Sequence, residues 1–359
     1  MKIIQFERDK SQFMSALRKN VNDYFKEKGI STKGNWKMVF KSTVMLSIYI
    51  APFVLMLVIP MAGWMIFPLA IVMGIGMAGT GMSVMHDAVH GSFSKKRWMN
   101  KMVGNTIFLL GTTVFNWKIQ HNILHHTFTN IDGMDEDIGG RELLRFSKHS
   151  PLKKIHRFQY IYAFFLYSFM TLSKLVKDFF QLYQYNKTGI TKQQNAKPKW
   201  EYTKLIGIKL VYFFTAIGLP IIFSNFTWWQ VLLGFIIMHC TAGIIMSIVF
   251  QMAHIVEGVD QPIPNPSGNI ENEWAIHQLQ TTANFSRRSR IMNWFIGGLN
   301  FQIEHHLFPN ICHIHYRKIS YIVEKTALEY GLQYNMKTTF VHALVSHTRM
   351  LKSLGRKAT

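Results

Sequence analysis

The sequence predicts an all-α integral membrane protein: four transmembrane helices in two hairpins, with a cytoplasmic helical cap that carries clustered histidines. Three observations support this fold class. Of the 359 residues, 48% are hydrophobic and only 16% are charged, a lower charged fraction than in soluble proteins of this size. Residues 42–94 and 210–286 contain no Lys or Arg. Three groups of histidines lie at or beyond the ends of the apolar runs.

Residues 1–37 are polar and basic, with one regular apolar pattern. Four apolar residues in this segment are spaced four apart: Phe13, Leu17, Val21 and Phe25. This spacing predicts an amphipathic helix. The N-terminus shows no signal-peptide core, so we expect membrane insertion to depend on the later apolar segments. We therefore divide the chain into a cytoplasmic amphipathic segment, 1–37, and a membrane domain, 38–359.

Each stretch without Lys or Arg is long enough for two membrane crossings, because about 20 apolar residues span the hydrocarbon core. The predicted spans are approximately Met38–Ile59, Trp64–Met85, Leu205–Phe223 and Gln230–Met252. Short turns around "IPMAGW" and "SNFTWW" separate the spans, so each pair forms a tight hairpin. Trp228 and Trp229 in the second turn suit a membrane interface.

The distribution of basic residues predicts the orientation. Both hairpin turns lack Lys and Arg, whereas the N-terminus, 95–204 and 287–359 are rich in them. By the positive-inside rule, we expect both termini, the middle segment and the histidine groups in the cytoplasm. The formal net charge of +21 fits an anionic membrane surface. Because the cations flank apolar segments, we expect no nucleic-acid partner.

The segment 157–185 is apolar in its first half only. Lys174, Lys177 and Asp178 follow too soon for a fifth span. We interpret this segment as one long helix that lies at the membrane interface.

Three groups of histidines have the spacing of neighbours on a helix. They are "HDAVH" (His86 and His90), "HNILHH" (His121, His125 and His126) and "QIEHH" (Gln302, His305 and His306). Residues three or four positions apart share one face of an α-helix. In the predicted topology all three groups lie on one side of the membrane, so they can converge.

This number of imidazoles indicates bound metal, because imidazole is a ligand for iron, zinc, copper and nickel. Seven histidines exceed the four ligands of one tetrahedral zinc, so the cap is predicted to hold a His-rich di-metal site. His254 and His277 are further candidate ligands, although a hydrogen-bonded core position would suit either of them. Cys240 and Cys312 form no CxxC pattern, which disfavours iron–sulfur, c-type haem and disulfide chemistry.

Five further histidines are predicted to lie in the core or in solvent, and the methionines in the core. His239 falls within the fourth span, where we expect a packing role. Four histidines in basic surroundings are expected to be solvated: His149, His156, His342 and His347. The 21 methionines show no MxxM clustering beside the histidines, so we interpret them as core residues and not copper ligands.

The three groups resemble the histidine boxes of integral-membrane fatty acid desaturases, with the pattern HxxxH, HxxxHH and QxxHH. The resemblance extends over roughly Gly81 to Tyr316 and includes "TNIDGMDEDI" and "NFQIEHHLFP". It implies a non-haem di-iron centre, dioxygen as co-substrate and a cis double bond introduced into a fatty acyl chain. The glutamine of the third box resembles the front-end, delta-5/delta-6-like branch, which desaturates between an existing double bond and the carboxyl end.

By position, the resemblance implies eight iron ligands: His86, His90, His121, His125, His126, His254, His305 and His306. Gln302 stands where other branches have histidine, and together with His277 it is a candidate ligand or a neighbour of ligands. Asp135 and Asp137 are expected to orient ligand imidazoles through their N–H groups, although a solvated acidic loop would also explain them.

The resemblance also implies partners. The substrate is expected to be a fatty acyl chain, carried by coenzyme A or by a membrane lipid, in a long, dry, apolar slot. Five aromatic residues could line that slot or belong to the core: Phe108, Phe115, Trp117, Trp294 and Phe295. The sequence contains no HPGG motif of a fused haem-cytochrome domain. Electrons are therefore expected from a separate ferredoxin or small haem cytochrome with its reductase.

Two other functions share some of these features. A lipid hydroxylase or ketolase of the same di-iron superfamily would retain oxygen in its product instead of forming a double bond. A metal transporter or sensor would carry ionisable residues within its spans, which contain almost none here. The sequence leaves open the acyl chain length, the carrier, the position of the new bond and the oligomeric state.

Overall fold

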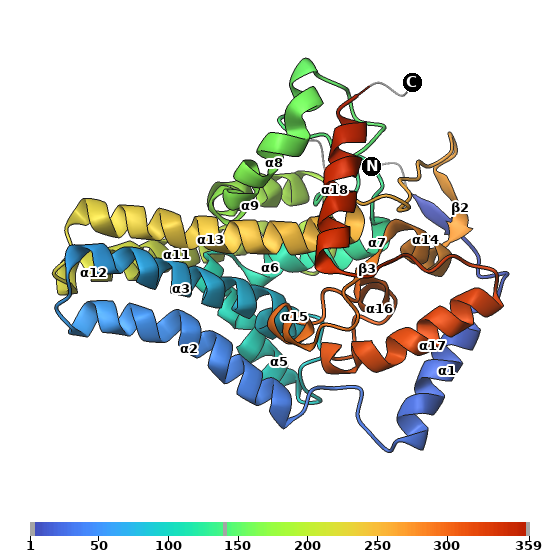
Figure 1. Cartoon of the computed structure of the whole chain (residues 1–359), viewed down its shortest axis with the longest axis horizontal. Coiled ribbons are helices and arrows are strands. Elements are labelled where there is room, and N and C mark those ends of the chain that lie inside the picture. Colours follow the sequence, from blue (N-terminus) through green and yellow to red (C-terminus); the bar gives the residue numbers. More distant parts are fainter. Residues whose placement is uncertain (1–3, 139–141, 357–359) are drawn as a thin grey trace.

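The structure, a computed structural model that describes residues 4–138 and 142–356, consists almost entirely of helices (Figure 1). Four helical segments are long and apolar enough to cross a membrane: Trp36–Val58, Gly63–Val89, Pro198–Phe223 and Trp228–His254. They overlap the four predicted spans and extend most of them by several residues. The predicted fold class, an all-α membrane protein with four spans, is confirmed.

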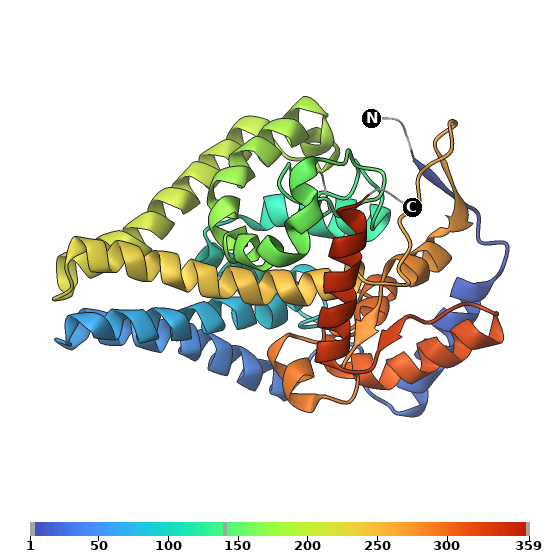
Figure 2. The ribbon, with the colours of Figure 1, turned by 45° about the horizontal axis from the view of Figure 1, so that its top comes forward.

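The four spans form two hairpins. The first joins α2 (Trp36–Val58) to a span composed of η1 (Gly63–Met65), α3 (Ile66–Gly79), η2 (Thr80–Met85) and α4 (His86–Val89). The second joins α11 (Pro198–Phe213), η6 (Phe214–Gly218) and α12 (Leu219–Phe223) to α13 (Trp228–His254). Because α3 packs along both α2 and α13, the second and fourth spans lie at the centre of the bundle (Figure 2).

The turns of the two hairpins are tied together at the end remote from the histidines. The side-chain amide of Asn225 donates to the carbonyl oxygen of Met61 at 2.7 Å, and its oxygen accepts the N–H of Met61 at 3.1 Å. Trp64, Trp228 and Trp229 near these turns are exposed. Exposed tryptophans at the ends of spans suit the lipid–water boundary.

The remaining elements form a cap at the opposite end of the spans (Figure 2). Between the hairpins run α5 (Arg97–Gly104), η3 (Asn105–Leu110), α6 (Val114–Trp117), η4 (Lys118–His125), α7 (His126–Phe128), η5 (Lys154–Phe158), α8 (Gln159–Ser168), α9 (Met170–Lys187) and α10 (Ile190–Gln193). After α13 come α14 (Trp274–Thr281), α15 (Arg290–Phe295), α16 (Gln302–Leu307), η7 (His313–His315), α17 (Tyr316–Glu329) and α18 (Phe340–Leu354). Two short parallel pairs complete the cap, β1 (Gln5–Glu7) with β2 (Asn269–Glu273) and β3 (Asn284–Phe285) with β4 (Met336–Lys337).

The N-terminal amphipathic helix is α1, Phe13–Glu27. Its four regularly spaced apolar side chains are all buried, and they join a core cluster with residues of α14, α16 and α17. Burial of this single apolar face attaches the N-terminal segment to the part of the cap that contains the third histidine group.

The prediction of one long helix over 157–185 is wrong, because α8 ends at Ser168 and α9 begins at Met170. The turn between them lies against α13 where that helix carries Gly243, and a Cβ on this glycine would collide with the carbonyl oxygen of Ser168. Thr171 also donates to the carbonyl oxygen of His239 on α13, at 2.8 Å. This close contact with α13 accounts for the break, which no local sequence signal marks.

Two of the histidines that were expected to be solvated, His156 and His347, are buried, so the prediction is wrong for them. The hydroxyl of Tyr167 lies 2.8 Å from Nε2 of His347, whose Nδ1 lies 2.7 Å from the carbonyl oxygen of Ile255. His342 is exposed, as expected. Helix α18 is amphipathic, so its basic residues say little about the side chains on its inner face.

Candidate metal centre

Two of the three histidine groups lie on or beside π-helical turns. The π-helical turn η2 leads into His86, and η4 ends at His125. The α-helix expected for the first group is present, since His86–Val89 form α4 and the N–H of His90 donates to the carbonyl oxygen of His86 at 3.1 Å. The α-helix expected for His121 and His125 is wrong, because η4 is π-helical there. In a π-helix, residues five apart hydrogen-bond, so His126 comes beside His121 and their Nε2 atoms are 3.3 Å apart. Such turns are rare and occur often at functional sites.

One set of donor atoms comes from four histidines that are distant in the sequence. His86, His90, His121 and His305 each offer a ring nitrogen, and these four nitrogens lie within 4.8 Å of one another. The Nε2 atoms of His86 and His121 are 3.1 Å apart. The end of the second span, η4 and α16 thus bring members of all three predicted histidine groups to one point.

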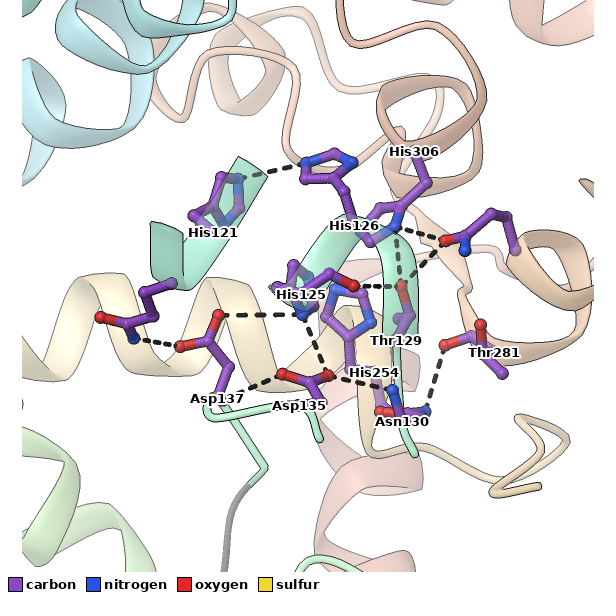
Figure 3. Close-up of polar contacts among 12 residues, drawn as sticks. His121, His125, His126, Thr129, Asn130, Asp135, Asp137, His254, Thr281 and His306 are labelled. Carbon is purple, nitrogen blue, oxygen red and sulfur yellow. Dashed lines mark hydrogen bonds and ion pairs between the residues drawn. The ribbon is translucent and has the colours of Figure 1, made fainter. Parts of the chain in front are cut away.

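A second set adjoins the first. Donor nitrogens of His125, His254 and His306 also lie within 4.8 Å of one another. His126 connects the two sets, because its Nε2 is 3.0 Å from Nε2 of His305 and its ring stacks on His306 with centroids 4.4 Å apart. Figure 3 shows how η4, α13 and α16 direct these rings toward one another. The eight predicted histidines form one cluster with two sets of donors.

Several nitrogens in this cluster have no hydrogen-bond partner within the described part of the chain. They are Nε2 of His90, His125 and His306, Nδ1 of His126 and both ring nitrogens of His254. A buried polar atom without a partner costs about 1–3 kcal/mol. A set of them directed at one another is the arrangement expected where a ligand completes the site, and imidazole nitrogens are suited to metal ions.

The cluster also favours the protonation state that metal binding requires. Burial, together with repulsion between neighbouring imidazolium charges, holds the pKa of His121, His126 and His305 well below its usual range. Burial and the same repulsion lower the pKa of His90 and His306. Neutral imidazole, with a free lone pair, is the form that binds a metal ion.

Asp135 and Asp137 hold His125 in place. Oδ2 of Asp135 lies 3.0 Å from Nδ1 of His125 and accepts the backbone N–H of Asn130 at 3.0 Å. Oδ2 of Asp137 lies 3.7 Å from the same Nδ1. Burial alone would lower the pKa of His125, but the two carboxylates outweigh it and raise that pKa. With Nδ1 engaged, Nε2 is left for the second set of donors (Figure 3).

Gln302 is the first residue of α16 and is buried. Its side-chain oxygen has no partner among the described residues. It lines the same cavity as His86 and His121. The predicted neighbourhood of Gln302, beside the histidines, therefore matches its position in the structure.

His277 lies outside both sets of donors, with its ring 5.0 Å from the ring of Phe6. The residue after it contacts the cluster instead, because Oε1 of Gln278 is 2.7 Å from Nδ1 of His306. Sequence reasoning missed Gln278. Gln278 lies in the same helix as His277 and both side chains are buried, but only the helical rotation of α14 shows which of the two contacts the histidine cluster.

A buried polar cluster, which was not predicted from the sequence, lies behind the first histidine group. Oδ2 of Asp87 lies 2.9 Å from Nδ1 of His313 and accepts the thiol of Cys312 at 3.0 Å. Nζ of Lys41 lies 2.6 Å from Nε2 of His313. The aspartate inside "HDAVH" was one available signal, since it adjoins His86. The motif "CHIH" after the third box was another.

A narrow cavity of about 160 Å³ lies beside the histidines. His86 and His121 form part of its wall, and four methionines line it: Met82, Met85, Met170 and Met246. Its lining continues from the second and fourth spans to polar residues of η4 and α9, including Gln120 and Lys174. An apolar slot with a polar end suits a molecule of the same character.

Of the five aromatic residues proposed for a substrate slot, Trp117 lines this cavity, and its ring lies 4.4 Å from that of His121. Phe115 and Phe295 pack against core clusters, and Phe108 and Trp294 are 41% and 37% exposed. The other expectation, a place in the core, therefore holds for Phe115 and Phe295, whereas the exposed side chains of Phe108 and Trp294 fit neither expectation.

The sequence of this chain is similar to sequences of known proteins. The fatty acid desaturase family model matches residues 62–338. The chain is 35% identical to an sn-1 linoleoyl-lipid 6-desaturase of Synechocystis sp., over 97% of this chain and 96% of that protein. It is 33% identical to an enzyme of the same name from Arthrospira platensis, over 96% and 92%. It is also 33% identical to an acyl-lipid (8-3)-desaturase of Physcomitrium patens, over 97% and 72%.

The matched range contains all three histidine groups, and the similarity to these relatives extends over nearly the whole chain. The resemblance in the histidine boxes is thereby confirmed, as is the expectation of an enzyme of lipid metabolism in a membrane. The chain belongs to the fatty acid desaturase family.

Proposed function

We propose that this protein is a front-end fatty acyl desaturase that introduces a cis double bond into an acyl chain of a membrane lipid, with two histidine-bound irons and dioxygen. The observation that carries the proposal is the pair of adjoining imidazole sets beside a narrow, largely apolar cavity. Membership of the family and the full-length relatives supply the reaction class.

The reaction removes hydrogen from unactivated methylenes, which no side-chain acid or base can do, so a bound cofactor must activate dioxygen. Two irons would supply that activation. Overall, the acyl chain gives up two hydrogens, and dioxygen combines with these, two electrons and two protons to form two waters. The proposed iron ligands are His86, His90, His121, His125, His126, His254, His305 and His306.

The residues of the chain position the reactants. The apolar wall of the cavity excludes water and constrains an otherwise flexible acyl chain to pass His86 and His121. Asp135 keeps Nδ1 of His125 engaged and so fixes the direction of its Nε2. Gln302, with an unpaired oxygen in the cavity wall, is proposed to adjust the donor set, since a neutral amide oxygen is a weaker ligand than imidazole.

The names of the relatives from Synechocystis sp. and Arthrospira platensis specify a linoleoyl lipid and desaturation at position 6. We extend this specificity to the present chain, because the similarity covers almost the full length of all three proteins. The new bond would then lie on the carboxyl side of the existing ones.

The orientation and the electron source belong to the same proposal. The hairpin turns lack Lys and Arg, whereas residues 1–37, 95–204 and 287–359 are rich in them. This distribution supports a cytoplasmic cap and cytoplasmic termini. Electrons would come from a separate donor, a ferredoxin or a small haem cytochrome with its reductase.

Lipid analysis of cells that express the protein and are fed linoleate tests the function. We expect a C18 acid with a new double bond on the carboxyl side, located by mass spectrometry of derivatised lipids. An empty-vector strain and His305→Ala should lack it, because the variant removes a proposed ligand. The exposed residue His342 provides the matched control, and His342→Ala should retain the product.

Two results would contradict the proposal. A product that retains oxygen from dioxygen would indicate a hydroxylase or ketolase. Desaturation on the methyl side alone, or of saturated chains alone, would show that the front-end assignment is wrong even though the enzyme is a desaturase.

A further inference from the structure

A strongly cationic surface covers the first histidine group. Three segments form it, 26–37, 95–101 and 309–318, and we refer to it as the cationic face. The segments contain one acidic residue, Glu27, and ten basic residues: Lys26, Lys28, Lys33, Lys37, Lys95, Lys96, Arg97, Lys101, Arg317 and Lys318.

Backbone hydrogen bonds join these segments although they are far apart in the sequence. The N–H of Cys312 donates to the carbonyl oxygen of Thr32 at 2.8 Å. The N–H of Gly34 donates to the carbonyl oxygen of Ser92, three residues before the second segment, at 3.1 Å. Beneath them, α5 and the segment after α16 share an apolar cluster with Met38 of α2. The three segments thus form one continuous surface.

The charges on this surface are available to a partner. Eight of the ten side chains are exposed, and Lys33 and Arg317 are half-buried. In the described part of the chain, none of the ten forms an ion pair, whereas Lys174, Lys209 and Arg287 elsewhere do. Unpaired like charges on one surface repel one another, so an anionic partner would be attracted to it.

The cationic face is separated from the histidines by a single layer of residues. Cys312 and His313 both contact Oδ2 of Asp87, at 3.0 and 2.9 Å, and Asp87 adjoins His86 in the chain. A second contact leads from the same segment to another histidine of the first donor set, because the hydroxyl of Tyr316 lies 3.3 Å from Nδ1 of His305. Electron transfer falls steeply with distance, so a thin bonded layer is the favourable place for a donor to dock.

We propose that the cationic face is the docking surface for an acidic one-electron carrier protein that reduces the metal centre. The proposal rests on the proposed function, since the reaction requires electrons from a separate protein. Each docking event delivers one electron, which the carrier loses and the centre gains, and two events supply one turnover. Docking of this kind typically uses small interfaces guided by charge.

A second surface also lies near the histidines, but its charge is not complementary to that of an acidic carrier. Trp274 donates to the carbonyl oxygen of His126 at 3.2 Å, so the surface around β1 and β2 also lies near the cluster. That surface, residues 5–11 and 269–274, contains four acidic and two basic residues. It would repel an acidic carrier, which leaves the cationic face as the favoured entry point.

The test uses charge reversal at one exposed residue from each segment: Lys28→Glu, Lys96→Glu and Lys318→Glu in one triple variant. The matched control reverses three exposed lysines on the α9–α11 connection: Lys187→Glu, Lys192→Glu and Lys197→Glu. Both triples change the net charge equally. Iron-loaded proteins are reconstituted in zwitterionic nanodiscs and, in parallel, in nanodiscs that contain anionic lipid. The probe is an acidic plant-type ferredoxin.

Two readouts apply. In the first, binding of oxidised ferredoxin is titrated without turnover. In the second, oxidation of reduced ferredoxin by the enzyme is followed by stopped flow. For the cationic-face triple we expect about ten-fold or greater loss in both at low salt, with a flatter salt dependence. The control triple should resemble the wild type. Single turnover driven by dithionite, which needs no docking surface, should be equal in all three proteins.

Three outcomes would overturn the docking proposal: wild-type ferredoxin binding by the cationic-face triple, an equal loss in the control triple, or a loss confined to nanodiscs with anionic lipid. The last would identify the face as a lipid headgroup surface. Failure of the proposed function looks different, because dithionite and dioxygen would then give no new double bond even in the wild type.

Discussion

At the residue scale, the property that defines the site is neutrality. Five histidines outside the spans have pKa values lowered by burial and by one another, and only His125 has two carboxylates near its ring. A nearly all-imidazole donor set adds little negative charge to a bound metal ion, unlike the carboxylate-rich sites of soluble di-iron bundles. The carboxylates of Asp135 and Asp137 beside His125 then mainly fix the orientation of its ring.

Gln302 provides a test of how much one donor position matters. Its buried oxygen is unpaired and lines the cavity. We expect Gln302→His to keep measurable desaturation, because imidazole can occupy an equivalent position. Gln302→Val should lose most of it, since no polar atom remains there. Product formation by gas chromatography is the measurement.

The iron content of the same two variants shows whether Gln302 affects the activity of the metal centre or the binding of iron. Both should bind iron like the wild type, because eight imidazoles remain. Full activity of Gln302→Val would contradict a role for the side-chain oxygen.

The histidines of the cluster and the side chains that contact their rings could be predicted from the sequence only in part. The boxes themselves follow from spacing, so His86, His121 and His305 could be identified from the sequence. The partners of their rings could not. Gln278 and Tyr316 are ordinary residues in sequence, and only the packing of α14 and α17 against α16 brings them to the imidazoles.

At the scale of elements, the second span determines the shape of the cavity. Gly81 lines the cavity, and a Cβ at this position would lie 3.0 Å from Cε of Met246 and 3.1 Å from Cδ2 of Leu110. A larger side chain would narrow the slot between the second and fourth spans. Gly207 on α11 offers a control, since a Cβ there meets nothing within 4 Å.

We therefore expect Gly81→Val to favour shorter acyl chains, by about ten-fold in the ratio of C16 to C18 products, which is the usual effect of a methylene or two in an apolar pocket. Gly207→Val should leave the ratio unchanged. Product profiles from cells fed equal amounts of both acids give the ratio. An unchanged ratio in Gly81→Val would show that the cavity does not hold the acyl chain.

Helix α18 is attached to the rest of the cap through His347. Burial lowers the pKa of this residue to about 4, so it stays neutral in the folded protein while the unfolded chain takes up a proton below about pH 6.5. The lowered pKa of the folded state means that stability is lost as the pH falls from 6.5 toward 4. At pH 4 this loss amounts to about 3 kcal/mol.

His347→Gln removes the titrating group. We expect the variant to be less stable than the wild type at pH 7, because two hydrogen bonds change, but to lose less stability between pH 7 and 4. Unfolding in detergent at several pH values measures this difference. The exposed residue His342 supplies the control, and parallel pH curves for wild type and His347→Gln would contradict the account.

The sequence predicted those helices that have a long or regularly repeated pattern of apolar residues. Twenty or more apolar residues mark a span, and four regularly spaced apolar residues marked α1. The break at Phe169 and the π-helical turns have no such signal. The break lies where the turn between α8 and α9 contacts α13, which is a tertiary effect.

At the scale of the whole molecule, the account requires the cap and the hairpin turns to lie on opposite sides of the membrane. Lys192 in the cap and Ala62 in the first turn are both exposed. In intact cells, Lys192→Cys should resist a membrane-impermeant thiol reagent and Ala62→Cys should react with it. The parent protein, with its own two cysteines, is the control. The reverse pattern would contradict the predicted orientation.

The central claim is that the converging histidines hold two irons. Metal analysis of the purified protein, set against its concentration from amino-acid analysis, tests this claim most directly. The account predicts two irons per chain and little zinc, with a marked loss of iron in His125→Ala and His305→Ala. One zinc per chain, or two irons retained in both variants, would contradict it.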